Sequence, residues 1–370
     1  MAASGALFKG TRKAASGWCE PFRLVRAKGY RGSLALAVLI SLLWINLCWG
    51  QSPRLQKNGL IPKVLVYAAN AENALVVDKS RQQVLLFANM GHWRMKGRWP
   101  CSTGSHAGRK VREGDRRTPE GVYFATKHVV QRYLADTYGT RALPLDYPNW
   151  LDRRQHRTGS AIWLHGTNKP LEPRDSNGCV VLDNDVIDGL VDKLRLNYTP
   201  VIIVDHMQWW SAWEARKTSH TILHLAGKWH AALMGSSYQN LKQWYVPGAA
   251  PTMKWWHQWC RVRHRHWIDR EYFHSTMQGT AIFRYGSTYV MLFDHNLRVR
   301  DEVVWAGQHK IYLRMQSGRA RIIGDTWQSN ASDNLPGRGR DPLFTAWRRL
   351  WRRAEDNGQL AVKAPAGPKS

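Results

Sequence analysis

The residues best suited to chemistry in this sequence are one histidine and one cysteine in a short central segment. Residues 162–182 read IWLHGTNKPLEPRDSNGCVVL, so Cys179 follows His165 by fourteen positions. A thiol becomes a strong nucleophile when a nearby base takes its proton, and imidazole is the usual base near neutral pH. The pair predicts a cysteine enzyme, although by pattern alone such a pair is more often structural than catalytic.

The residues that flank the pair fit supporting roles in such an enzyme. Gly178 allows a backbone geometry that a side chain would hinder, and it lets a substrate approach closely. Backbone N–H groups at Gly178 and Cys179, with Asn177 as a further donor, would stabilise an oxyanion. Gly166 leaves a backbone carbonyl accessible to orient the imidazole, and Ser176 belongs to the same predicted set.

Strand signals surround the central segment, from residue 63 to residue 206. Apolar runs bounded by turn formers predict strands, and helical spacing of apolar residues predicts a helix. These signals predict a strand in VLVYA (64–68), a hairpin about residues 78–82, a short strand within GDRRTPEGVYFAT (114–126), a helix at 186–194 and a strand at 199–205. Residues 63–206 therefore predict a β-rich domain with few helices.

The segment HGT…SNGC resembles the signature of the YkuD-type L,D-transpeptidases, in which a histidine–glycine pair precedes a Ser/Thr-x-Gly-Cys turn. Three further stretches resemble the family in the same order: ALVVDKSRQQVLLF, CSTGSHAGRKVREGDRRTPEGVYF and LPLDYPNWLDRRQHRTGSAIWLHG. The resemblance implies a YkuD-like mixed β-sandwich, with Cys179 as nucleophile and His165 as general base and acid. It implies peptidoglycan stem peptides as the substrate, with neither a metal nor a cofactor.

By this resemblance, Cys179 attacks the L,D-peptide bond of a tetrapeptide stem and releases the terminal D-alanine. An amine then resolves the thioester in a transpeptidase, and water resolves it in an L,D-carboxypeptidase that trims stems to tripeptides. Two departures bear on this choice, since many members have histidine in place of Asn177 and arginine or asparagine in place of Val181. Transpeptidase is the first expectation, carboxypeptidase the second, and a catalytically silent wall-binding scaffold the alternative from a different class.

Basic residues near the central segment are candidate contacts for substrate carboxylates. We expect these contacts at Arg174, Arg116 and Lys110. A solvated basic face is the alternative interpretation of the same residues.

Residues 219–328 predict a second domain of the α+β class. Apolar residues recur at roughly helical spacing over 222–245, and four alternating segments follow, with Ser317–Gly318 as a hairpin turn between the last two. This order resembles a nuclear transport factor 2-like cone, which some cell-wall enzymes of the YkuD family carry after the catalytic domain. The resemblance implies a binding or positioning role, because no second catalytic pair stands out.

Both ends of the chain differ from the two predicted domains. Basic residues precede an apolar run at 34–49, so residues 1–50 predict a signal peptide or an uncleaved N-terminal membrane anchor, followed by a linker at 51–62. We therefore expect a periplasmic protein, attached to the inner membrane if the segment is retained. Residues 329–370 predict a basic tail with an amphipathic helix near 342–355, which would pack on its own domain or on a membrane surface.

The charge of the chain predicts polyanionic partners. Lys and Arg number 54 against 27 Asp and Glu, which gives a formal net charge of +27. Such a surface favours nucleic acid, anionic lipid or an acidic wall polymer. Because no nucleic-acid-binding module is recognisable, we expect peptidoglycan, with an anionic membrane surface or a cell-wall protein as further candidates, and no nucleic acid.

Neither a disulfide framework nor a metal site is favoured. Five cysteines are few for an exported protein of 370 residues, and Cys101 is expected to be a buried small hydrophobe. The cluster of His257, Cys260, His264 and His266 matches no strong zinc spacing. We interpret it as part of a basic, half-exposed strand.

Overall fold

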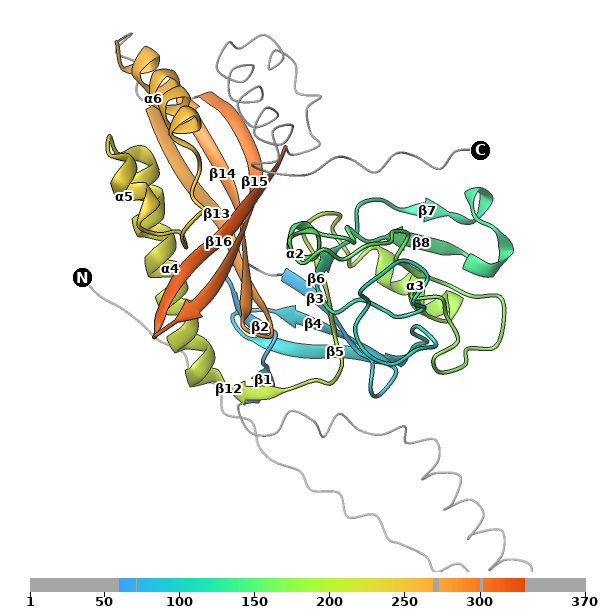
Figure 1. Cartoon of the computed structure of the whole chain (residues 1–370). Coiled ribbons are helices and arrows are strands. Elements are labelled where there is room, and N and C mark those ends of the chain that lie inside the picture. The colour runs from blue at the N-terminus through green and yellow to red at the C-terminus, as the bar shows by residue number, and fades with distance from the viewer. Residues whose placement is uncertain (1–59, 71, 269–272, 300–301, 330–370) are drawn as a thin grey trace, which may run out of the picture. The chain divides into compact units, whose positions relative to one another are not determined.

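The structure is a computed structural model that describes residues 60–70, 72–268, 273–299 and 302–329 (Figure 1). The predicted targeting segment at 1–50 and the predicted helix near 342–355 lie outside these residues. Within them, no helix combines the length and the apolar character that crossing a membrane requires.

A five-stranded mixed sheet lies at the centre of the part that the sequence predicts to be catalytic. Its strands are β3 (Glu72–Asp78), β4 (Gln83–Asn89), β5 (Trp93–Pro100), β6 (Gly121–Phe124) and β11 (Pro200–Val204), in the order β5-β4-β3-β11-β6. β11 is parallel to β3 and antiparallel to β6, and β3 pairs with β4 in the hairpin that the sequence predicts. Along β3, Leu75 and Val77 enter one core while Val76 enters another, so this sheet is buried on both faces.

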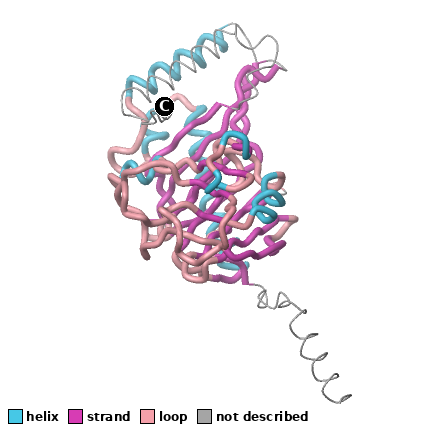
Figure 2. Tube along the Cα trace, turned by 90° about the vertical axis from the view of Figure 1, so that its right-hand side faces the viewer, coloured by secondary structure: helices cyan, strands magenta, loops and turns pink. Residues whose placement is uncertain are grey.

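A second, smaller sheet covers one face of the central sheet and carries the site. It consists of β7 (Val129–Val130), β8 (Arg141–Pro144), β9 (Trp163–His165) and β10 (Val180–Val181), in the order β10-β9-β8-β7. Two short helices, α2 (Trp150–Arg154) and α3 (Asn184–Val191), and two 3₁₀ turns complete this part. Loops make up much of the face that carries the second sheet (Figure 2). The prediction of a mainly β domain with few helices is confirmed.

The C-terminal part consists of helices followed by an antiparallel meander, as the sequence predicts. Its elements are α4 (Ala212–Met234), α5 (Tyr238–Lys242), α6 (Met253–Ile268), β13 (Phe273–Tyr285), β14 (Thr288–Val299), β15 (Glu302–Gln316) and β16 (Arg319–Ser329). Ser317 and Gly318 have φ of +48° and +74°, as a two-residue turn of type I′ between β15 and β16 requires. The predicted hairpin turn at these residues is therefore confirmed.

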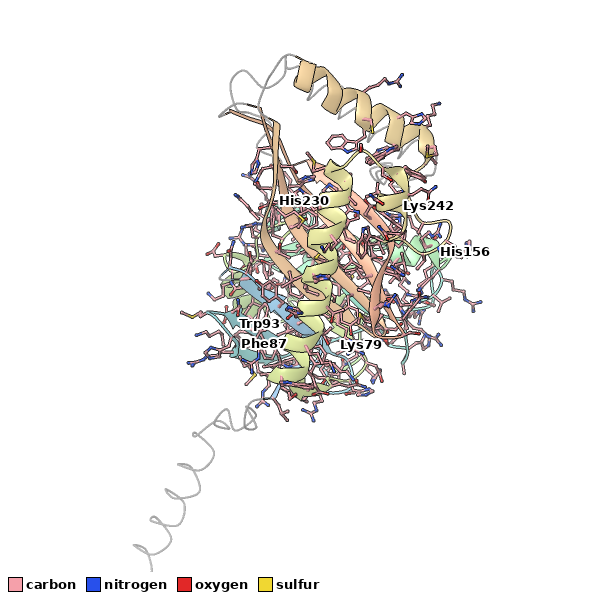
Figure 3. All side chains as sticks on the ribbon, turned by 90° about the vertical axis from the view of Figure 1, so that its left-hand side faces the viewer. Lys79, Phe87, Trp93, His156, His230 and Lys242 are labelled. Carbon is pink, nitrogen blue, oxygen red and sulfur yellow. The ribbon has the colours of Figure 1, made fainter. Side chains whose placement is uncertain are left out.

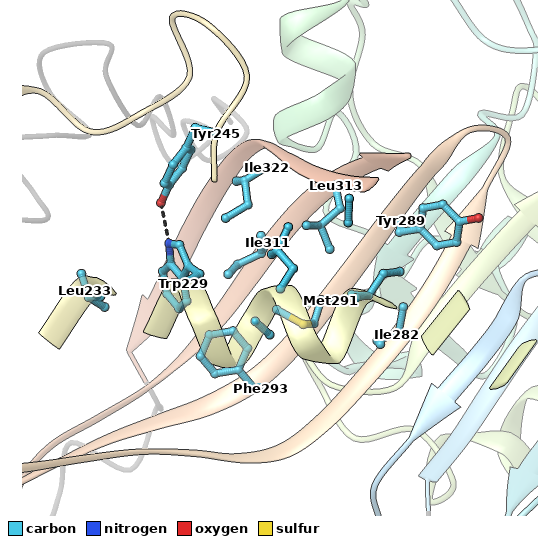
Figure 4. Close-up of a cluster of buried hydrophobic side chains, with 14 of the residues drawn as sticks. Trp229, Leu233, Tyr245, Ile282, Tyr289, Met291, Phe293, Ile311, Leu313 and Ile322 are labelled. Carbon is cyan, nitrogen blue, oxygen red and sulfur yellow. Dashed lines mark hydrogen bonds between the residues drawn. The ribbon is translucent and has the colours of Figure 1, made fainter. Parts of the chain in front are cut away.

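An apolar core joins these helices to one face of the meander (Figure 4). Trp229 of α4 lies at its centre, and its indole N–H donates to the hydroxyl of Tyr245 at 2.9 Å. Trp259 of α6 is fully buried and donates its indole N–H to the carbonyl of Leu233 at 2.7 Å. Because each indole places its polar atom on a partner, these large aromatic side chains can be buried without an unsatisfied donor.

The structure corrects the prediction of a strand at residues 257–266. These residues belong to helix α6, which begins at Met253. Trp255, Trp256 and Trp259 recur at helical spacing and are buried against the C-terminal core, whereas His257 is exposed. The basic residues therefore belong to an amphipathic helix, and this tryptophan periodicity was the signal for it.

Two element boundaries also differ from the sequence analysis. Helix α4 begins at Ala212 rather than near 219, because Ser211 and Glu214 form a capping box, a signal visible in the sequence as Ser-x-x-Glu. The last three residues of the predicted linker form β1 (Leu60–Pro62), which pairs antiparallel with β12 (Trp209–Ser211). Ile61 is packed there against apolar cores, so this end of the segment is ordered structure.

Strand β2 (Leu65–Ala68) links the two parts of the fold. β2 falls within the predicted catalytic range 63–206, but it pairs antiparallel with β13 and completes the C-terminal sheet in the order β16-β15-β14-β13-β2. Strand pairing with a partner so distant in the sequence leaves no local signal, so a sequence pattern cannot reveal it.

Candidate active site

Two short parallel strands bring His165 and Cys179 together. β9 ends at His165, and β10 pairs with it in a register that sets Val180 opposite Leu164 and Val181 opposite His165. Cys179 immediately precedes β10, so continuing this register puts it beside Trp163. Paired residues in neighbouring strands point to the same face, and this places Cys179 and His165 on one face at diagonal positions.

The imidazole of His165 is buried and held by a backbone carbonyl. The side chain is 5% exposed, and its Nδ1 lies 2.6 Å from the carbonyl oxygen of Gly166. Since a carbonyl can only accept, Nδ1 carries the proton, and Nε2 of the neutral ring is left as a base. Burial lowers the pKa of His165, with the hydrogen bond to Gly166 in partial opposition, so the ring is neutral at neutral pH.

Tyr138 packs against His165, and sequence analysis did not single it out. Its ring meets that of His165 edge-on, with 4.9 Å between ring centroids. Burial raises the pKa of the Tyr138 phenol, and the charge of a Cys179 thiolate raises it further. Tyr138 thus packs on the imidazole and lies within electrostatic reach of the thiol.

The side chain of Asn184, the first residue of α3, explains why residue 166 is glycine. A Cβ atom at Gly166 would lie 2.2 Å from the Asn184 side-chain oxygen. That oxygen accepts the backbone N–H of Thr140 at 3.0 Å, while the Asn184 amide donates to the side chain of Asn168 at 2.9 Å. Asn184 therefore fixes the turn after His165, and no local pattern in the sequence marked it for this role.

The residues before β10 form a tight turn that we call the catalytic turn, residues 175–179. The Ser176 hydroxyl donates to the carbonyl of Cys179 at 2.8 Å and accepts the N–H of Gly178 at 3.1 Å. Gly178 has φ of +124°, and a Cβ atom there would lie 2.8 Å from the Arg117 carbonyl. Both the backbone angle and the close approach therefore require glycine.

This geometry modifies the predicted oxyanion donors. Because Ser176 accepts the Gly178 N–H, that group already has a partner in the resting enzyme, which leaves the Cys179 N–H as the remaining donor of the pair. The Asn177 side chain is exposed beside the turn. Ser176 contributes by shaping the turn through its hydroxyl.

The β5–β6 loop, residues 101–120, supports the catalytic turn from the other side. The N–H of Ser105 donates to the carbonyl of Ser176 at 2.9 Å, and the N–H of Ser176 donates to the carbonyl of Thr103 at 3.1 Å. Gln82, in the β3–β4 hairpin, accepts the N–H groups of Thr103 and Arg174 on one side-chain oxygen. The hairpin, the loop and the turn are thereby joined by hydrogen bonds.

The thiol of Cys179 is half-buried, and its surroundings shift its pKa in opposite directions. Burial raises its pKa, while backbone hydrogen bonding with Trp163 and the positive charge of Lys110 lower it. The net shift is upward, so thiol and imidazole are both neutral at rest. The arrangement suits proton removal by His165 during attack rather than a preformed thiolate.

Lys110 lies in the β5–β6 loop as a buried cation. It is 3% exposed, and its ammonium donates to Asp115 at 2.8 Å. Burial raises the pKa of Asp115, but Lys110 and backbone N–H groups outweigh this and lower it to about 2. This ion pair gives Lys110 a position from which its charge reaches Cys179; direct contact with a substrate stays a prediction.

The other two predicted substrate contacts lie near the site on unusual backbone. Arg116 is exposed with φ of +52°, and Arg174 is half-buried with φ of +58°. The Arg116 carbonyl accepts the N–H of His106, and the Arg174 N–H donates to Gln82. Backbone contacts thus hold both residues, and their roles toward a substrate stay predictions.

Cys101 is unsuited as a second nucleophile, and the described residues contain no group of metal ligands. Cys101 is buried, as predicted, and burial raises the pKa of its thiol to about 12, which makes it a poor nucleophile. Across the part of the chain that the structure describes, no three or more His, Cys, Asp or Glu side chains are grouped so that they could hold a metal ion.

A second set of histidines lies in the C-terminal part, where sequence analysis singled out no pair. His230 of α4, labelled in Figure 3, Ser275 of β13, His295 of β14 and His309 of β15 form a hydrogen-bonded chain that we call the histidine network. The Ser275 hydroxyl lies 2.7 Å from Nε2 of both His230 and His295. His295 and His309 are buried, so this part of the histidine network lies inside the fold.

Fold and site together define a β domain with a thiol–imidazole pair suited to acyl transfer. Residues 72–203 match the sequence model of the YkuD family, described as the L,D-transpeptidase catalytic domain. This match confirms the YkuD catalytic domain that the sequence predicts, and His165 and Cys179 both lie within it. No curated protein matches the chain.

Two solved structures are similar over more than this domain. The structure of Bdellovibrio bacteriovorus Bd1075 is 24% identical, with a TM-score of 0.61, and the match covers 74% of this chain and 100% of that one. The helical cell shape determining protein Pgp2 from Campylobacter jejuni is 19% identical, with a TM-score of 0.56, and the match covers 71% of this chain and 94% of that one. At these identities the likeness concerns the fold, and it extends beyond residues 72–203.

Proposed function

We propose that the chain is a peptidoglycan L,D-transpeptidase that forms a thioester at Cys179. Nε2 of His165 removes the thiol proton as Sγ attacks the carbonyl carbon of the L,D-peptide bond in a tetrapeptide stem. An S–C bond forms and the C–N bond breaks, and His165 returns the proton to the amine of the departing D-alanine. The observation that carries this proposal is the Gly166 carbonyl on Nδ1, because it leaves Nε2 as the base on the face shared with Cys179.

The second half-reaction distinguishes transfer from trimming. An amine acceptor on the thioester carbonyl gives a cross-link, whereas water gives a tripeptide stem and an L,D-carboxypeptidase. The exposed Asn177 stands where many members of the family have histidine, and the buried Val181 stands where many have arginine or asparagine. This departure supports the carboxypeptidase as the second candidate.

We propose that the C-terminal part is a nuclear transport factor 2-like domain with a binding or positioning role. Helices packed on one face of a bent antiparallel meander support this architecture. The proposed setting is the periplasm, reached by the N-terminal segment, which is either cleaved or kept as an inner-membrane anchor. The net charge of +27 supports an anionic membrane surface or a cell-wall protein as a further partner.

Product analysis tests this function directly. Purified protein is incubated with tetrapeptide muropeptides, and products are identified by chromatography and mass. D-alanine release with L,D-linked dimers supports the transpeptidase, and tripeptides without dimers support the carboxypeptidase. Cys179→Ala should abolish both, whereas Cys260→Ala, in helix α6, should leave them unchanged. Unaltered muropeptides with the natural sequence would contradict the enzyme and favour a wall-binding scaffold.

A further inference from the structure

Lys79 is a buried cation that the proposed reaction does not use. Its side chain is 1% exposed, and it directly follows Asp78, the last residue of β3. Figure 3 labels Lys79. Its ammonium donates to the carbonyl of Gly108 at 2.6 Å, the carbonyl of Thr118 at 3.2 Å and a carboxylate oxygen of Glu120 at 2.7 Å. All three acceptors belong to the β5–β6 loop, so one cation uses its three donors to hold the two ends of residues 108–120 together.

Tyr285 reaches the same segment from the end of β13 in the C-terminal sheet. Its hydroxyl donates to the second carboxylate oxygen of Glu120 at 2.7 Å. The guanidinium of Arg109 lies over its ring, 4.7 Å from the centroid. Glu120 therefore accepts from Lys79 and from Tyr285, while Tyr285 contacts the loop at Arg109 as well.

The segment held in this way contacts the catalytic turn. The Arg117 carbonyl approaches Gly178 so closely that a Cβ atom there would lie 2.8 Å from it. Lys110, in the same segment, lowers the pKa of Cys179 through its charge. A displacement of the segment would therefore move both the wall of the turn and the nearest cation to the thiol.

We propose that Tyr285, Glu120 and Lys79 are positioning residues through which the C-terminal sheet holds the β5–β6 loop against the catalytic turn and sets the reactivity of Cys179. This inference rests on the proposed function, because a positioning role in catalysis requires that Cys179 is the nucleophile. The reactivity of the thiol can be measured without any substrate. The C-terminal part thus acts on the site through a defined chain of contacts.

Tyr285→Phe tests this chain, because it removes the hydroxyl and keeps the ring over Arg109. The matched control is Tyr198→Phe, whose hydroxyl donates to Asp294 of β14 at 2.6 Å, outside the β5–β6 loop. In the full chain, the alkylation rate of Cys179 by iodoacetamide is measured from pH 6 to 10 and assigned by peptide mass. We expect Tyr285→Phe to slow alkylation at pH 8 by about fivefold and to move the pH midpoint upward, as loss of one hydrogen bond to a charged group would.

Glu120→Gln provides the second variant and should move the midpoint at least as far, because it also weakens the contact with Lys79. Equal alkylation profiles for Tyr285→Phe and Tyr198→Phe, with Glu120→Gln like the natural sequence, would overturn the proposal. If the natural sequence leaves muropeptides unchanged while the profiles differ as expected, the proposed function fails and this inference holds. If muropeptides are processed and the profiles coincide, the proposed function holds and this inference fails.

Discussion

The candidate active site and the histidine network both combine imidazole with a potential nucleophile, but the hydrogen bonds of the imidazole differ. At the site, the Gly166 carbonyl occupies Nδ1 of His165 and leaves Nε2 as a base. In the network, the Ser275 hydroxyl lies between His230 and His295, so the imidazoles and the hydroxyl bind one another. The difference shows that residue types alone do not define a catalytic pair: one ring nitrogen must be held so that the other is left for the reaction.

Loss of the base should have the largest effect and tests the catalytic side of the comparison. His165→Ala is expected to lower kcat/KM for D-alanine release by about 10² to 10⁴, the usual contribution of a general base. Added imidazole should restore part of the activity, because the substitution leaves room beside Tyr138. A loss below tenfold in a folded variant would argue against His165 as the base.

Gly178→Ala should have the next largest effect on kcat/KM. The left-handed φ and the approach to the Arg117 carbonyl would shift the catalytic turn, and a displacement of about 1 Å costs about a hundredfold in rate. Gly189→Ala in α3 is the control, since a Cβ atom there meets nothing within 4 Å. Equal activity in the two variants, measured as kcat/KM, would contradict the structural role of Gly178.

Ser275→Ala tests the other side of the comparison. Removing this hydroxyl takes a partner from two imidazoles, which should lower the free energy of unfolding by about 1–3 kcal/mol and leave kcat/KM within about twofold. Thr221→Ala, on α4 and outside the histidine network, serves as the control in denaturant unfolding. A large loss of activity without loss of stability would give the network a functional role that its closed hydrogen bonding does not suggest.

Acid should separate the two regions by smaller, graded effects. Burial lowers the pKa of His309 to about 3 and that of His295 well below its ordinary value. The unfolded chain binds protons at these histidines from about pH 6.5 downward while the folded chain does not, so stability should fall as pH drops below that value.

Burial lowers the pKa of His165, so the acid limb of kcat/KM should lie below pH 6.5. Thermal melting and rate measurements between pH 4.5 and 8 check both trends. A melting temperature that rises on acidification would contradict the role of His295 and His309 in stability. An acid limb above pH 7 would contradict the lowered pKa of His165.

The sequence was informative where signals are local. The β3–β4 hairpin, the turn at Ser317–Gly318 and the short motifs around His165 and Cys179 all depend on neighbouring residues, and the structure contains each of them. The start of α4 and helix α6 also had local signals, the capping box and the tryptophan spacing, which the sequence analysis did not use.

The supporting residues could not be found in this way. Gln82 acts on Arg174, Lys79 on Glu120, and Asn184 on the turn at Gly166, and each pair is separated by many residues. Such contacts depend on the tertiary fold, and the residue types involved are common at surfaces. Sequence therefore identified the candidate reacting groups, and the structure was needed for the residues that hold them.

The pairing of β2 with β13 joins segments that are synthesised far apart in time. Ala68 pairs with Ala281, which is synthesised about two hundred residues later. Until then β2 has no partner on that edge, and an unpaired edge invites association with other chains. Pairing over such a separation is also slow, because a long loop must close first. A chain interrupted before β13 would carry the reacting residues on a fold with an open edge, which makes completion of the C-terminal sheet a safeguard against aggregation during biogenesis.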